Sequence, residues 1–235
     1  MSVTPPAVAT LLADLQRLFT SRLAALVVYG GQQGPGPTRC LALVDGLSAQ
    51  DLESCARQIR AWQKAGLATP LVLPATEFRD SLDAFPLEYG AIIRWHHVVH
   101  GDDPFAGAHI SAEDTRRACE TQIRSHLVHV REGYIEAADS PKDIAALISA
   151  SIPAFAALLR HVAWLCGDAA HAVESGRSIA HLGAQLAGLS AGTVDALLQL
   201  EHDAGLASGD AARLFPEYLA ALDHLARFIN GWRQP

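Results

Sequence analysis

The sequence predicts an α+β fold, in which a small mixed sheet with helices is followed by a C-terminal helical bundle. In the first half of the 235-residue chain, short aliphatic and β-branched runs alternate with segments of helical periodicity. After residue 108 helical periodicity continues, and no strand-like run interrupts it. We therefore expect two domains, residues 1–108 and residues 109–235.

The first elements follow from apolar spacing. Apolar residues at helical intervals predict a helix over residues 6–21. The continuous apolar run Leu23–Tyr29 predicts a buried strand that ends at the glycine pair Gly30 and Gly31. A loop rich in glycine and proline then leads to a second predicted strand, residues 40–44.

The remaining elements of the first half are shorter. Ser48 is a predicted N-cap for a helix that ends before Gly66, and Asp51 suits its first turn because a negative charge there favours the helix dipole. A third strand is expected over residues 70–73 and a short helix over residues 77–82. Residues 85–99 are predicted to carry a fourth strand before the turn at residues 101–104.

The second half is predicted to contain five helices. Ser111 is an expected N-cap, with Asp114 at the third helical position, for a helix that ends near residue 136. Pro141 begins the next helix, which continues to Cys166 and is expected to kink or break at Pro153. Three further helices are expected over residues 178–189, 191–202 and 208–232. Short connections predict an up-and-down bundle.

Net charge, apolar runs and cysteine positions limit the kinds of function that the protein can have. The net charge of −7 excludes non-specific nucleic-acid binding, because no excess of Lys and Arg could neutralise a phosphate backbone. Polar residues interrupt the apolar positions near the N-terminus, and no other stretch has eighteen uninterrupted apolar residues, so we expect a cytoplasmic protein without a membrane span. The four cysteines are scattered, which predicts reduced, buried thiols and no cysteine zinc site.

The pair Gly30 and Gly31 is the first candidate binding feature. Glycines directly after a buried strand let backbone amides approach a phosphate without interference from a Cβ. The alternative is a tight turn with no ligand. Because the chain has no Walker motif and no GxGxxG motif, a P-loop or dinucleotide-binding fold is not supported.

The order of these elements resembles that of the nucleotidyltransferase superfamily, of the kanamycin-nucleotidyltransferase and DNA-polymerase-β type. Members have a helix, a strand that ends in a Gly-Ser turn, a second strand with an Asp-x-Asp pair, a third carboxylate on a later strand, and a helical bundle. The segments 85–88, 100–105 and 117–134 also look like a bacterial subgroup of this superfamily. The resemblance implies a nucleotide or phosphate ligand. In active members it also implies Mg²⁺ bound by the carboxylates.

The sequence departs from that pattern at the metal site. Gly31 stands in place of the turn serine, and residues 37–43 contain no acidic residue. The third carboxylate would fall near Glu88 or Ala91, and Asp45 comes after the second strand. Glu88 and Asp45 are therefore weak catalytic candidates. These departures from the family pattern favour a degenerate metal site. Mg²⁺ would be a cofactor only if the protein were an active enzyme.

A histidine cluster is a second candidate site. If His96–His100 is a strand, His96 and His100 share a face and His97 points to the other. Together with Asp102 they are weak candidates for a zinc or transition-metal site. The favoured alternative is partly exposed polar residues on an edge strand.

Arginines on the first bundle helix are the third candidate. Arg117, Glu120, Arg124 and Arg131 recur at helical spacing and share a face. Arg117 and Arg124 are candidates to bind phosphate or carboxylate groups, in a cleft between the two halves, because guanidinium groups form paired hydrogen bonds to such anions. The alternative is a solvated face with internal ion pairs.

Three hypotheses about function remain open. The leading one is a nucleotidyltransferase-like pseudoenzyme with a degenerate metal site, which binds nucleotide or phosphate or has a regulatory role. The second is a divergent active nucleotidyltransferase that acts on a small molecule or a protein and uses Glu88, Asp45 or Asp102. The third is a structural interaction protein, such as a homodimer through the helices near residues 204–229.

Overall fold

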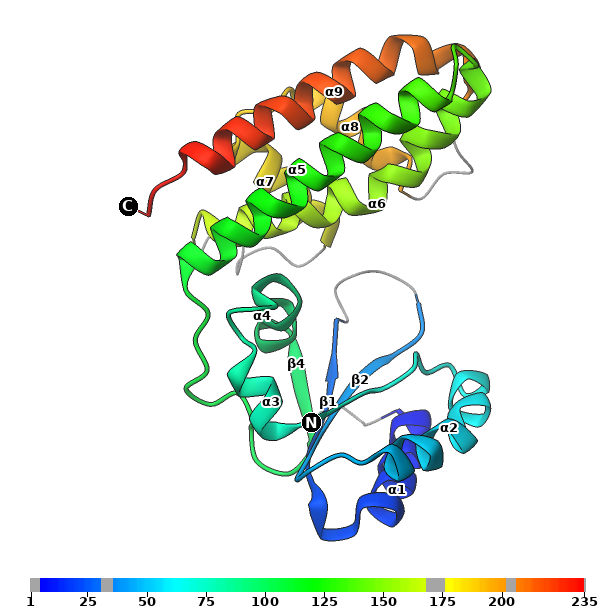
Figure 1. Cartoon of the computed structure of the whole chain (residues 1–235), viewed down its shortest axis with the longest axis vertical. Coiled ribbons are helices and arrows are strands. Elements are labelled where there is room, and N and C mark those ends of the chain that lie inside the picture. The colour runs from blue at the N-terminus through cyan, green and yellow to red at the C-terminus, as the bar shows by residue number, and fades with distance from the viewer. Residues whose placement is uncertain (1–4, 31–35, 168–175, 202–205, 235) are drawn as a thin grey trace. The chain divides into compact units, whose positions relative to one another are not determined.

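The computed structural model describes residues 5–30, 36–167, 176–201 and 206–234. It divides into two compact units, Met1–Ile110 and Ser111–Pro235 (Figure 1). The boundary between these units lies two residues after the position at which the sequence pattern changes.

The first unit contains a four-stranded mixed sheet. Its strands are β1 (Leu23–Tyr29), β2 (Arg39–Val44), β3 (Leu71–Pro74) and β4 (His96–His100), in the spatial order β3-β2-β1-β4. β1 is antiparallel to both β2 and β4, and β3 is parallel to β2. The predicted α+β class is confirmed.

Helices cover both faces of this sheet (Figure 1). Helices α1 (Pro6–Phe19) and α2 (Ala49–Lys64) lie on one side, and the shorter α3 (Ala75–Asp80) and α4 (Pro86–Arg94) on the other. Because side chains alternate along a strand, Leu26 and Ala42 pack toward α1 and α2, whereas Val27 and Leu41 pack toward α3 and α4. Each face thus has its own apolar core.

The predicted cap of α2 is confirmed. The Ser48 hydroxyl accepts a hydrogen bond from the Asp51 amide at 3.2 Å, and the Asp51 carboxylate accepts one from the Ser48 amide at 2.9 Å. Arg22, from the 3₁₀ turn Thr20–Arg22, donates two further hydrogen bonds to the same carboxylate, at 2.7 and 3.0 Å. A pair of local signals in the sequence therefore fixes where α2 begins.

The predicted strand over residues 85–99 is wrong in its first part. Residues Pro86–Arg94 form α4, and only His96–His100 form a strand. Pro86 is at the first helical turn, where its missing N–H costs nothing, and Glu88 supplies a negative charge in that turn. Glu88 and Ala91 are therefore helical residues, and neither lies on a strand.

The second unit consists of helices in its described residues. These are α5 (Ala112–Glu136), α6 (Pro141–Leu165), α7 (Gly176–Leu186), α8 (Ala191–Gln199) and α9 (Ser208–Gly231). The Ser111 hydroxyl accepts a hydrogen bond from the Asp114 amide at 3.0 Å, so the predicted cap of α5 is confirmed. The predicted end of the fourth bundle helix, at residue 202, lies outside the described residues.

Helix α6 is the core helix of this bundle and packs against α5, α7 and α9. It is continuous through Pro153, so a break at that residue does not occur. The cost of one lost backbone hydrogen bond is offset there by apolar burial on both sides, including Ile152 and Phe155, which are fully buried. Among the described helices α6 alone is long and apolar enough to span a membrane, a property that core helices share.

The bundle also contains a very close helix contact. A Cβ added to Gly183 of α7 would lie 1.9 Å from the Leu159 carbonyl oxygen of α6. Glycine is therefore required at position 183 for the two backbones to approach this closely.

Candidate functional site

The first predicted site is the turn that follows β1, at the end of the sheet where β1 ends. Gly30 has φ +76°, a conformation that favours glycine, and its amide donates a hydrogen bond to the Trp95 carbonyl at 3.2 Å. That amide already has a partner within the protein. Gly31, the other predicted phosphate-binding residue, lies outside the described residues.

Strand β2 presents no carboxylate at this end. Arg39 pairs with Tyr29, the last residue of β1, and Arg39 and Leu41 have the i, i+2 spacing of an Asp-x-Asp pair. Leu41 is fully buried, and Arg39 is exposed. Burial raises the pKa of Tyr29, and the positive charge of Arg39 opposes that shift. A cation and an aliphatic side chain thus stand at this end of β2, whose residues include no Asp or Glu.

The two weak catalytic candidates lie elsewhere. The amide of Asp45 bonds to the Arg22 carbonyl at 2.8 Å, which places Asp45 beside the start of β1 and not beside its end. β1 is seven residues long, so its start and its end are roughly 20 Å apart. Glu88 is an exposed residue in the first turn of α4. Asp45 therefore does not accompany the Gly30 turn.

The histidine candidates lie on β4. His96 shares the sheet face of Val98 and Phe105, and its ring meets Phe105 edge-on, with the centroids 4.6 Å apart. Its Nδ1 lies 2.9 Å from the Ile93 carbonyl oxygen and its Nε2 lies 3.3 Å from Asp103 Oδ1. Both ring nitrogens therefore have partners within the protein.

The other members of that set do not complete a metal site. His100 pairs with Leu26 at the far end of β4, and Asp102 is exposed in the turn after it. Within the described residues, no three His, Cys, Asp or Glu side chains lie close enough together to hold a metal ion. β4 is an edge strand of the sheet, and the interpretation of these residues as polar residues without a metal stays a prediction.

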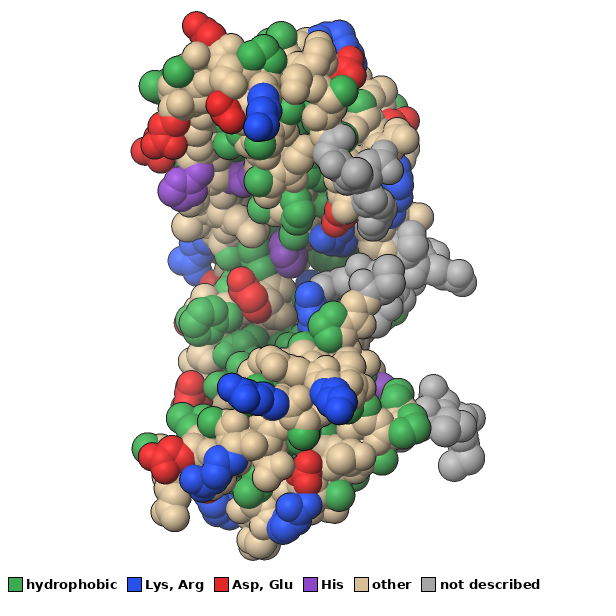
Figure 2. Space-filling view, turned by 90° about the vertical axis from the view of Figure 1, so that its right-hand side faces the viewer, with side chains coloured by type: hydrophobic (Ala, Val, Ile, Leu, Met, Phe, Trp, Pro, Cys, Tyr) green, Lys and Arg blue, Asp and Glu red, His purple; other side chains and the backbone are tan. Residues whose placement is uncertain are grey.

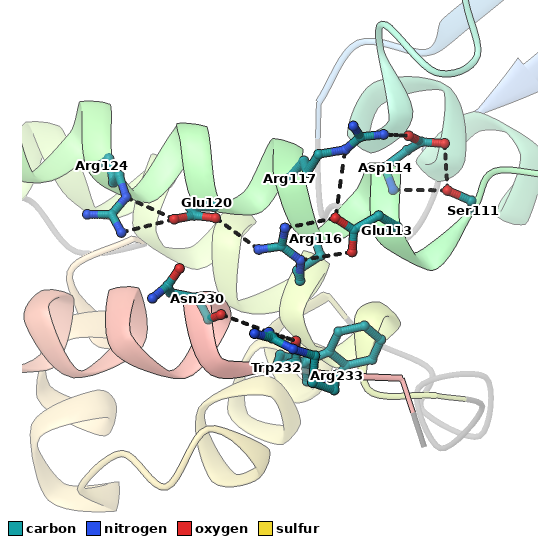
Figure 3. Close-up of polar contacts among 10 residues, drawn as sticks. All are labelled: Ser111, Glu113, Asp114, Arg116, Arg117, Glu120, Arg124, Asn230, Trp232 and Arg233. Atoms are coloured by element: carbon teal, nitrogen blue, oxygen red, sulfur yellow. Dashed lines mark hydrogen bonds and ion pairs between the residues drawn. The ribbon is translucent and has the colours of Figure 1, made fainter.

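The arginine face of α5 is a ladder of ion pairs (Figure 3). Arg117 donates to Asp114 at 2.5 Å, Arg124 donates to Glu120 at 2.9 Å, and Arg131 reaches Asp223 of α9 at 2.8 Å. These contacts match the alternative of a solvated face with internal ion pairs. The side chains of Arg117 and Arg124 remain 64% and 58% exposed, so a role in ligand binding stays a prediction.

Arg116 is the residue of this ladder that sequence analysis missed. Its guanidinium donates to both Glu113 and Glu120 at 2.9 Å, and its side chain is only 14% exposed (Figure 3). The hydrogen bond from Arg116 is the first cause that lowers the pKa of each of these carboxyls. The i, i+3 and i, i+4 spacing of acidic residues around Arg116 could have identified it.

A partly buried polar pair lies between α5 and α9 of the bundle. His126 Nε2 of α5 is 2.7 Å from the Tyr218 hydroxyl of α9, and Tyr218 is fully buried. Burial lowers the pKa of His126 and raises that of Tyr218. The neutral forms of both side chains are therefore favoured, and their contact links α5 to α9.

Charges on the surface are mixed. On the face drawn in Figure 2, acidic and basic side chains are interspersed over the described residues. The prediction against non-specific nucleic-acid binding stays a prediction.

The chain was compared with protein-family models, curated proteins and solved structures. No protein-family model matches the chain, and no curated protein matches it in sequence. Among solved structures it is similar to the crystal structure of spectinomycin adenyltransferase AAD(9) from Enterococcus faecialis with ATP and spectinomycin, a nucleotidyltransferase. The identity is 12% and the TM-score 0.48, over 97% of this chain and 100% of the other. At this identity and score, the likeness assigns neither a ligand nor an activity to the chain.

Proposed function

We propose that this chain is a nucleotidyltransferase-like protein with a degenerate metal site, which binds a nucleotide or phosphate group and has a binding or regulatory role without transferring the group. The observation that supports this proposal is the pair of residues on β2 beside the Gly30 turn. Arg39 is exposed there, and Leu41 is buried in the core. An exposed guanidinium favours a phosphate oxygen and repels a divalent cation.

The residues at this end do not fit two Mg²⁺ ions. Mg²⁺ needs oxygen ligands in near-octahedral geometry, and the described residues hold no cluster of carboxylates that could supply them. Asp45 lies roughly 20 Å away along β1. The proposal therefore contains no metal-dependent step.

Calorimetric titration with ATP, in EDTA and in Mg²⁺, tests the proposal. We expect ATP to bind in EDTA and to release no pyrophosphate in either buffer. Arg39→Ala should weaken binding by about tenfold, the usual order of effect when one charged hydrogen bond is lost. Arg60→Ala, an exposed arginine on α2, is the matched control and should bind as the unchanged protein does.

Two results would contradict the proposal. Mg²⁺-dependent binding with pyrophosphate release would favour the divergent transferase. Absence of any ATP, GTP or phosphate affinity would favour the structural interaction protein. The double variant Arg117→Ala, Arg124→Ala in the same titration tests the predicted contribution of the α5 arginines.

A further inference from the structure

A cavity of about 380 Å³ lies in the first unit between α2 and the edge strand β3. Its volume is within the range of small-molecule sites, about 300–1,000 Å³. Its walls are mainly apolar and include Leu52, Cys55, Ile59, Trp62, Pro70 and Val72. It is separate from the Gly30 turn, and nothing in the proposed function uses it.

The cavity arises where a helix extends beyond the sheet. Leu52, Cys55, Ile59 and Trp62 form one helical stripe on α2. Trp62, at one end of the stripe, is only 2% exposed because it packs into the core with α1, whereas Leu52 is 51% exposed. Among the described residues, no strand lies beyond the four-residue β3 to cover the stripe. The chain thus leaves a large apolar side chain at the open mouth of a cavity.

The chemistry of the walls selects the ligand. None of the residues that line the cavity carries a charge. The indole N–H of Trp62 already donates to Asp14 Oδ2 at 2.9 Å, so it does not demand a polar partner. Burial raises the pKa of Cys55, which keeps its thiol neutral. A charged ligand would lose its hydration here without gaining a partner.

We propose that this cavity is a binding site for an uncharged, apolar small molecule, such as an aromatic or aliphatic ring compound. Two features favour a small molecule over a macromolecule. The exposed face of α2 beside the cavity carries Glu53, Arg57 and Arg60, which would be costly to bury in an apolar interface. Pro70 precedes β3 and Pro74 is its last residue. Because proline has no backbone N–H to donate, these residues limit pairing of a further strand to this edge.

A pair of fluorescent probes tests the charge selection. N-phenyl-1-naphthylamine is uncharged, and 1-anilinonaphthalene-8-sulfonate has the same aromatic skeleton with one negative charge. We expect the uncharged probe to bind the full chain saturably at one site per chain. The sulfonate should bind at least about tenfold more weakly, because its charge would be buried without a partner.

A matched pair of variants locates the site. Ala56 lines the cavity from an exposed position on α2, so Ala56→Phe fills the cavity without disturbing the core. Ala61→Phe introduces the same side chain at another exposed position of the same helix and is the control. We expect Ala56→Phe to weaken binding of the uncharged probe by at least about tenfold and Ala61→Phe to leave it unchanged.

Several results would overturn the inference. They are the absence of saturable binding, equal affinity for both probes, or unchanged binding by Ala56→Phe in a variant whose circular dichroism matches that of the unchanged chain. If sedimentation shows that the chain dimerises and that the dimer excludes the probe, the occupant is a second copy and the inference is also wrong. None of these outcomes depends on whether ATP binds at the Gly30 turn.

Discussion

The Asp51 carboxylate accepts four hydrogen bonds, two from Arg22 and two from Ser48. Hydrogen bonds from Arg22 and then Ser48 hold the pKa of Asp51 well below its ordinary value. A carboxyl with a depressed pKa in the folded state stabilises the fold above its unfolded-state pKa, and this contribution is lost as the pH falls through acid values. Acid should therefore weaken the anchorage of α2.

The variant Asp51→Asn tests this contribution. At pH 7 we expect its melting temperature to fall by about 2–4 °C, since it loses both the capping box and the pair with Arg22. Near pH 3 the difference should shrink, because Asp51 takes up a proton in the unfolded chain while it stays ionised in the folded one. Glu53→Gln on the same helix is the control. A deficit that is equal at both pH values would contradict the charge-based explanation.

His126 gives the bundle a pH dependence of its own. Burial lowers its pKa below the ordinary value of 6.5, so the unfolded chain takes up a proton before the folded one as the pH falls. Stability from the neutral ring is complete above about pH 6.5 and declines below it. Thermal unfolding between pH 7.5 and 5 should therefore show a falling melting temperature that is less steep in His126→Gln. His109→Gln, an exposed histidine outside the bundle, should keep the full slope.

At the scale of elements, backbone approach constrains the bundle more than side-chain size does. Gly183→Ala would push a Cβ into the Leu159 carbonyl, so α6 and α7 must separate. We expect a loss of about 1–3 kcal/mol in the free energy of unfolding, measured by chemical denaturation. Gly192→Ala in α8 meets no atom within 4 Å and serves as the control. A Gly183→Ala chain as stable as the control would show that the two helices can separate without cost.

The element that the sequence failed to predict is also instructive. Continuous apolar runs identify β1 and β2 because both strands are buried on two faces. α4 is only nine residues long and its buried residues include Leu87, Tyr89 and Ile92, an apolar run that a strand would share. Pro86 was the available sign of a helix start. Short, mostly buried helices of this kind cannot be distinguished from strands by periodicity alone.

At the scale of the whole molecule, the two-part organisation could be predicted from the change in pattern, and the candidate sites only in part. Ion pairs along α5 follow from local spacing. The partner of Gly30 does not, because the Trp95 carbonyl comes from a distant part of the chain, and the same holds for the pair of Arg131 with Asp223 of α9. The cavity beside β3 was missed for the same reason, since it depends on where the sheet ends.

The burial of Leu41 limits the substitutions that strand β2 can accept. A carboxylate at position 41 would replace a fully buried leucine that packs among Phe78, Tyr89 and other apolar side chains. Without a metal already in place, the buried charge would cost more stability than a marginally stable domain can lose. A carboxylate at position 41 therefore requires compensating changes in the side chains around it, and a single substitution there should lower the stability of the first unit.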